Sequence, residues 1–299
     1  MAKGNTPGDI VAERIKSRAR LTGQPVLALL KRYVLERALY RLVEAYGLGI
    51  MLKGSMVAVI DDPETARAAP DIDVHLKAME DIEKIVPDLL TRTYYDSNSA
   101  TGLLEDHVRF TSIRVVPLQH SEGAGVKFKI EAMLGATRVN VAIDFGFGHG
   151  SMSALEVKKF PAMFKGLPGV LVSCQPAADA IADKIRAMAD FGMDNTRVKD
   201  LHDVCFRIRN GTFDAEAVAR SLAMSGAEFE SSPVCVTPEY AAAHEATWQA
   251  WLVKAGLKDS RTLAEVVAEI RQPVEAATRA AARLRERARQ PALRLVASR

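Results

Sequence analysis

The residues most able to do chemistry are two aspartates separated by a single position. Asp71 and Asp73 lie in segment 71–76, where polar and apolar residues alternate strictly. This period-two pattern predicts a β-strand with both carboxylates on one face and His75 beyond them. Two carboxylates on one face repel each other unless a cation lies between them, and Mg²⁺ prefers hard oxygen ligands. A polar outer face on an edge strand is the competing interpretation.

A third aspartate favours the metal interpretation. Asp144 lies in segment 139–145, on the face opposite to Val141, Ile143 and Phe145. An aspartate in such an apolar setting is costly to bury unless it is paired or bound to a metal. If this strand neighbours the first, three carboxylates converge, and two Mg²⁺ ions about 4 Å apart could clamp the attacking and leaving oxygens of an in-line displacement. Mn²⁺ is an alternative ion for the same site.

A glycine–serine pair suggests where an anion would bind. The apolar run 50–52 meets Gly54 and Ser55, and a helix is expected to follow. A strand that runs into such a turn and then a helix directs free backbone amides to one point, which suits a triphosphate. Glycine lets the backbone come close, and the serine hydroxyl adds a donor. Ordinary strand-to-helix turns also commonly contain these two residue types.

Two later segments contribute charged candidates. The helix predicted over 176–191 places Lys184 among small residues, with room to reach a phosphate or, alternatively, to extend from the edge of a buried face into water. Asn195 and Thr196 are predicted to cap a second helix, which carries Asp200 and Asp203. The helix dipole alone would favour these acidic residues. Their functional interpretation is a base for an acceptor hydroxyl, or a group that organises Lys184 and Arg197.

The chain divides into three zones that must position these residues. Residues 1–46 are expected to be a helical segment, 47–174 an α/β core and 175–299 a helical domain, which together form an α+β fold. Three features of detail are predicted. A helix covers 80–90, a turn at 123–125 joins two strands, and 146–150 and 165–169 are loops. The helical third zone is expected to be interrupted at Pro233, Pro238, Gly256 and Pro273.

Composition limits the class of protein. No apolar run is long enough to span a bilayer, and the first residues do not resemble a signal peptide. The three cysteines, Cys174, Cys205 and Cys235, form no metal-ligand pair, so a cytoplasmic location is the simplest expectation. The net charge of +3 does not identify a partner. Arginines are nevertheless concentrated near both ends, which suits a polyanion or, alternatively, a solvated helix face.

Taken together, these motifs resemble the AbiEii/MenT family of nucleotidyltransferase-like toxins from prokaryotic toxin–antitoxin systems, within the polymerase β-type nucleotidyltransferase superfamily. The resemblance extends from about Leu29 to Val204, in five ordered motifs. They are the entry helix at 29–42, one nucleotide and metal motif made of segments 52–55 and 71–74, the third-carboxylate motif at 143–148, and two C-terminal motifs at 181–188 and 195–203. It implies a small mixed sheet of that superfamily's fold between helical flanks.

The resemblance also implies a role for each matching residue. Metal binding falls to the aspartates of both strands: Asp71, Asp73 and Asp144. Nucleotide binding falls to the first motif and to two later cations: Lys53, Gly54, Ser55, Lys184 and Arg197. Lys184 would contact the triphosphate, and Asp200 would be essential for transfer. The implied partners are a nucleoside triphosphate, an RNA acceptor such as the 3′ end of tRNA, and a cognate antitoxin.

Departures from the family pattern leave two alternatives open. Ala69 replaces the usual serine or threonine, His149 the usual acidic residue, and Asp183 the usual glutamate before the motif lysine. The carboxylates and the lysine remain, so we expect an active Mg²⁺-dependent nucleotidyltransferase that blocks translation. A nucleotide-binding module without transfer, and a nucleotidyltransferase acting on a small molecule, are the alternatives.

Overall fold

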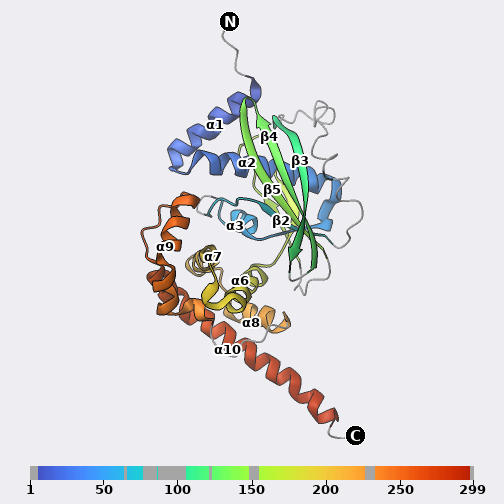
Figure 1. The fold of residues 1–299 in the computed structure, drawn as a ribbon. Helices are drawn as coiled ribbons and strands as arrows, with labels where there is room; N and C mark the ends of the chain where they lie inside the picture. The colour runs from blue at the N-terminus through green and yellow to red at the C-terminus, as the bar shows by residue number, and fades with distance from the viewer. Residues whose placement is uncertain are drawn as a thin grey trace. The chain divides into compact units, whose positions relative to one another are not determined.

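The computed structural model describes residues 6–63, 66–76, 86, 106–120, 123–147, 155–225 and 233–296. The chain forms two compact units, of which the first comprises Met1–Gly150 and Leu155–Gln175 and the second runs from Pro176 to Arg299 (Figure 1). Within the described residues, no helix is both long and apolar enough to cross a membrane. The helix expected over 80–90 lies outside the described residues except for Val86, which is helical.

The first unit consists of helices around one mixed sheet. Its helices are α1 (Pro7–Thr22), α2 (Val26–Tyr46) and α3 (Ser55–Asp61), with a 3₁₀ turn at Gly47–Gly49. Its strands are β1 (Ile50–Lys53), β2 (Ile72–Leu76), β3 (Val108–His120), β4 (Gly123–Leu134), β5 (Thr137–Phe147), β6 (Glu156–Phe160) and β7 (Val170–Cys174). The two helices that precede the sheet belong to the same unit as the sheet.

The strand order within the described residues is β3-β4-β5-β2-β1-β7-β6. The pairs β2–β5 and β1–β7 are parallel, and the other neighbouring strands are antiparallel. Buried apolar residues of β2 and β5 alternate with partly buried or exposed ones, as the period-two patterns predict. The predicted α+β class with a mixed sheet is therefore confirmed.

A two-residue turn sets the register of the longest hairpin. Leu134 of β4 pairs with Thr137 of β5, and Gly135 lies between them with φ of 60°, a conformation that glycine adopts readily. The Asp9 carboxylate of α1 accepts a hydrogen bond of 2.8 Å from the Ala136 amide. Helix α1 therefore holds this turn in place.

The hairpin predicted around 123–125 is confirmed, because β3 and β4 are antiparallel and His120 pairs with Gly123, but Gly123 and Gly125 begin β4 instead of forming its turn. The loop predicted from residue 146 was wrong at its start, since residues 146–147 end β5. Gly125 pairs with Gly146 across these two strands, and neither has a positive φ. Glycine marks a turn where the backbone needs a positive φ, and here it only fills a ladder position. The segment 165–169 is irregular, as predicted.

Helix α2 carries charged residues that are buried. Arg32, Glu36, Arg37 and Arg41 are each 5% exposed or less, although the helix packs against β5, β7 and β1. Each bonds to a connecting segment. Arg32 donates to the Pro63 carbonyl, Glu36 accepts from the Met163 amide, Arg37 donates to the Pro168 carbonyl and Arg41 donates to the Val108 carbonyl. Because buried charges are tolerated only with such partners, α2 fixes the connections at the sheet ends.

The second unit is helical around one apolar core. Its helices are α6 (Ala177–Phe191), α7 (Val198–Arg209), α8 (Ala215–Met224), α9 (Pro238–Ala255) and α10 (Leu263–Val296), with 3₁₀ turns at Gly192–Asp194 and Val234–Val236. Trp248 and Tyr240 of α9 are completely buried. The predicted helix over 176–191 is confirmed, with Pro176 at its N-cap.

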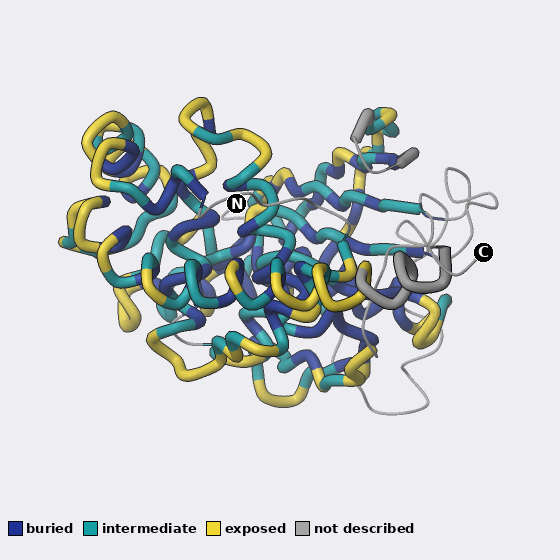
Figure 2. The backbone as a smooth tube through the Cα atoms, turned by 90° about the horizontal axis from the view of Figure 1, so that it is seen from below, coloured by how far each residue is buried: buried dark blue, intermediate teal, exposed yellow. Residues whose placement is uncertain are grey.

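The prediction that Pro273 interrupts a helix was wrong, because α10 continues through it. Proline removes one backbone hydrogen bond, but one face of α10 stays completely or almost completely buried on both sides of it, at Leu263, Val266, Val267, Ile270, Val274, Ala277 and Ala281. The side chains of residues 283–289 are mostly exposed (Figure 2). Arg285 is partly buried and donates a 2.8 Å hydrogen bond to the Leu222 carbonyl of α8.

The buried Arg41 should contribute strongly to the stability of the first unit. Its guanidinium donates to both oxygens of Asp106, at 3.0 and 3.2 Å, and lies over the Phe110 ring. Arg41→Met leaves the Asp106 carboxylate without this partner and should lower the free energy of unfolding by about 3 kcal/mol. Arg138→Met, which removes an exposed ion pair to Glu131, should cost less than about 1 kcal/mol. Urea titration of both variants tests this, and equal losses would contradict it.

Candidate functional site

A row of charged residues crosses the centre of the sheet. Lys53 of β1 pairs with Asp73 of β2, Asp73 pairs with Asp144 of β5, and Asp144 pairs with Lys127 of β4. Residues directly opposite each other on neighbouring strands project from the same face. The four side chains are partly buried and share that face. We call this set, Lys53, Asp73, Asp144 and Lys127, the charged row.

Lys127 is the member that the sequence analysis missed. Its ammonium lies 2.9 Å from Asp144 Oδ2, and the two side chains are 25% and 16% exposed. Asp144 is therefore paired, as its apolar surroundings require. Partial burial alone would lower the pKa of Lys127, but the hydrogen bond and charge of Asp144, with the charges of Asp71 and Asp73, raise it above its ordinary value. All three predicted aspartates thus stabilise the charged form of this one lysine.

Gly54 is required by the carboxylate beside it. It has φ of 67° and stands at the N-cap of α3, directly after β1. A side chain at this position would collide with the Asp73 carboxylate. The glycine therefore allows both the turn and the close approach of Asp73. Ser55 begins α3, and Asp71 stands immediately before β2.

The donors of this site suit a hard cation. Asp71, Asp73 and Asp144 supply carboxylate oxygens, the ligands that Mg²⁺ prefers, and Gly54 leaves space for one of them. Among the described residues, however, no three His, Cys, Asp or Glu side chains are grouped closely enough to hold one ion together. These carboxylates are of the residue type that binds a divalent ion. One of them, Asp144, forms an ion pair with Lys127 in this structure.

In the second unit, Lys184 of α6 is held by two carboxylates of α7. Its ammonium lies 3.1 Å from Asp200 Oδ1 and 2.8 Å from Asp203 Oδ2. The Lys184 side chain is only 19% exposed. The ammonium is therefore positioned by α7 and does not extend freely into water.

Asp200 lies completely inside the second unit. Its side chain is 0% exposed, and Oδ2 lies 2.9 Å from Arg197 Nε, so two cations flank one carboxylate. A carboxylate in this position organises Lys184 and Arg197, and its burial does not favour direct contact with an acceptor hydroxyl. The predicted cap differs in detail. Arg197 is the N-cap of α7, and the Asn195 side chain accepts a 2.8 Å hydrogen bond from the Arg197 amide.

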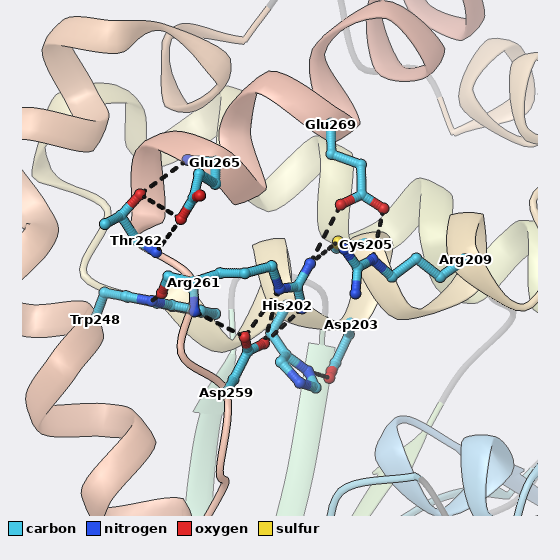
Figure 3. Close-up of polar contacts among 10 residues, drawn as sticks. All are labelled: His202, Asp203, Cys205, Arg209, Trp248, Asp259, Arg261, Thr262, Glu265 and Glu269. Carbon is cyan, nitrogen blue, oxygen red and sulfur yellow. Dashed lines mark hydrogen bonds and ion pairs between the residues drawn. The ribbon is translucent and has the colours of Figure 1, made fainter.

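A second polar network joins residues of α7, of α10 and of the segment that precedes α10 (Figure 3). Arg261 donates to Asp259, to Cys205 Sγ at 3.0 Å and to Glu269 at 3.3 Å. Arg209 of α7 pairs with the same Glu269 at 2.7 Å. A groove of about 490 Å³ runs along this network. Its arginines are engaged with carboxylates, so we interpret the network as a support that fixes α7 against α10.

Comparison with known proteins identifies the relatives of this chain. A family model described as the nucleotidyl transferase AbiEii toxin of type IV toxin–antitoxin systems matches residues 37–292. No curated protein matches. Two solved structures from H. pylori, a protein assigned as a nucleotidyltransferase and the protein JHP933, share 13% identity and a TM-score of 0.49 with this chain. They cover 85% and 87% of this chain, and each alignment covers 96% of the H. pylori chain.

The Lys184–Asp200 contact should be energetically coupled. Lys184→Met removes one of the cations that flank a completely buried carboxylate, and Asp200→Asn removes the charge itself. The double variant should lose less stability than the two single losses added together, with a coupling free energy of about 1–3 kcal/mol. Chemical unfolding of the four proteins measures this coupling. Additive losses within about 0.3 kcal/mol would show that the two side chains do not depend on each other.

Proposed function

Because the chain belongs to the AbiEii family of nucleotidyl transferase toxins, matched over residues 37–292, we propose that it transfers a nucleoside monophosphate from a nucleoside triphosphate to the 3′ end of an RNA, with tRNA as the acceptor. Loss of a usable tRNA end would block translation. The observation that carries the proposal is the direct pairing of Asp73 with Asp144 at the centre of the sheet, with Asp71 and Lys127 close by.

The proposed reaction is an in-line displacement at the α-phosphorus. The 3′-hydroxyl oxygen of the acceptor forms a bond to this phosphorus, and the bond from the phosphorus to the oxygen bridging to the β-phosphate breaks. Pyrophosphate leaves, and the hydroxyl proton passes to water or to a carboxylate. A divalent ion held by Asp71, Asp73 and Asp144 would stabilise the charge that develops on the phosphate oxygens. Mg²⁺ is the proposed ion, and Mn²⁺ is an alternative.

The remaining assignments concern the nucleotide. Gly54 and Ser55 offer backbone and hydroxyl donors directly after β1, and Lys53 belongs to the charged row. Lys184 is proposed to contact the triphosphate as a point charge, because Asp200 and Asp203 hold its ammonium in one place. Arg197, whose side chain is 49% exposed and which contacts the same Asp200, would add a second cation beside Lys184. Asp200 is proposed to act through these two cations.

Asp73→Asn should abolish transfer while preserving the fold. The substitution keeps the shape of the side chain beside Gly54 but removes one anionic ligand, and the rate should fall at least about a hundredfold. The assay incubates the protein and Mg²⁺ with each labelled triphosphate in turn and bulk RNA, and measures label at RNA 3′ ends. Asp190→Asn, at an exposed position of α6, is the matched control and should retain full activity.

Two results would contradict these assignments. Wild-type turnover by folded Asp73→Asn would remove the metal role of Asp73. Absence of labelled RNA with every triphosphate would remove RNA as the acceptor. In that case, binding of triphosphate without transfer would support a binding module, and labelling of a small molecule would support the other alternative.

The C-terminal part of α10, where residues 286–289 are exposed, is proposed to bind the RNA backbone. A chain that ends at Arg285 keeps the buried face of α10 and the Leu222 contact, and it loses residues 286–299, which include four arginines: Arg287, Arg289, Arg294 and Arg299. RNA affinity should then depend less steeply on salt, by about 0.7 in log–log slope for each lost single-strand phosphate contact. Triphosphate affinity should not change.

Affinity measured at several salt concentrations for both chains tests this role. Equal slopes would remove the C-terminal arginines from RNA binding. A lower melting temperature with an unchanged slope would instead show that this segment serves the fold.

A further inference from the structure

We propose that the Lys127 ammonium occupies the place of a second divalent ion beside Asp144. The protein without nucleotide therefore binds one divalent ion instead of two. The inference rests on the proposed function in so far as that function places a metal at Asp71, Asp73 and Asp144. It changes the expected two-ion arrangement, and it assigns a positioning role to a residue outside the recognised motifs.

The backbone fixes Lys127 beside Asp144. The two residues are direct partners in the β4–β5 ladder, and the residues on either side of Lys127 are buried, Val126 at 5% and Phe128 at 0% exposure. Phe128 also packs edge-on against Phe145, with ring centroids 5.3 Å apart. A lysine anchored in this way keeps its ammonium within reach of the carboxylate, where the contact of 2.9 Å is observed.

The charge balance of the site also favours one ion. Three carboxylates, Asp71, Asp73 and Asp144, lie with two lysines, Lys53 and Lys127, which leaves one net negative charge. One divalent ion reverses this balance to a single positive charge. A second ion would add two more positive charges beside a lysine, which repulsion in a partly buried site opposes. The nucleotide brings its own negative phosphates, so a second ion is expected to arrive with it.

The position of Asp144 within the group supports the same conclusion. No three His, Cys, Asp or Glu side chains of the described residues form a common ligand set, and one of the three proposed metal carboxylates, Asp144, is bonded to Lys127. Removing the ammonium while keeping the length of the side chain should therefore free Asp144 for metal. A purely structural ion pair would change stability but not the number of ions bound.

The test counts bound Mn²⁺ in the absence of nucleotide, from the electron paramagnetic resonance signal of the ions that remain free in solution. The wild-type chain should bind one Mn²⁺. Lys127→Met should bind two, or bind one at least about tenfold more tightly, because a competing positive charge has been removed. Lys127→Arg keeps the cation and should behave as wild type. Lys129→Met is the matched control, since Lys129 lies on the same face of β4 but pairs with Ala142 and is exposed.

The outcomes separate this inference from the proposed function. Identical number and affinity of ions in Lys127→Met and wild type would overturn the inference, and Lys127→Gln provides a second neutral variant should the methionine variant not fold. Two ions bound by the wild type, or none bound by any variant, would also overturn it. Absence of RNA labelling, combined with the expected gain of Mn²⁺ in Lys127→Met, would leave the inference standing and overturn only the transfer to RNA.

Discussion

Two negative charges lie side by side at the centre of the sheet, and much of the first unit is arranged around them. Asp73 and Asp144 are direct partners in the parallel pair β2–β5, where their repulsion would destabilise the ladder. Lys53 and Lys127 flank them on the next strands and offset this repulsion. Gly54 has no side chain, which leaves room for the Asp73 carboxylate. The repulsion that remains would favour a cation beside these carboxylates, as the proposed function requires.

Helix α2 fixes the strands on either side of this row. Its buried charges bond to the segments that enter β3 and that lie between β6 and β7, through Arg41 at Asp106 and Glu36 at Met163. Burial raises the pKa of Glu36, while the charge of Arg37 and the Met163 amide oppose that shift. The cost of removing these charges from water offsets most of the free energy gained from their contacts. The contacts nevertheless specify one geometry. Helix α2 therefore fixes the ends of β3, β6 and β7, of which β3 and β7 lie next to the strands that carry the row.

The features that could be predicted from the sequence are those that depend on the local periodicity of polar and apolar residues. Alternation identified β2 and β5 and placed Asp73 and Asp144 on polar faces, and helical spacing identified α6 with Lys184. Lys127 was missed because its importance depends on which strand lies beside β5 and in which register. The signal was present: alternation over 126–132 and a glycine turn at 135–136 together align Lys127 with Asp144. The turn predicted at 123–125 concerns the preceding hairpin, β3–β4. No turn was predicted at 135–136, so the register that aligns Lys127 with Asp144 was not recognised.

The register of this hairpin has a consequence for how the chain can change. Asp9 and Gly135 fix the turn, and the described β4–β5 ladder runs from it to Asp144 without a shift, whereas β3 has an irregularity near Phe110. One residue inserted between Lys127 and the turn would move the lysine to the opposite face unless a bulge absorbed it. An insertion in this hairpin therefore keeps Lys127 beside Asp144 only when both strands lengthen by the same number of residues.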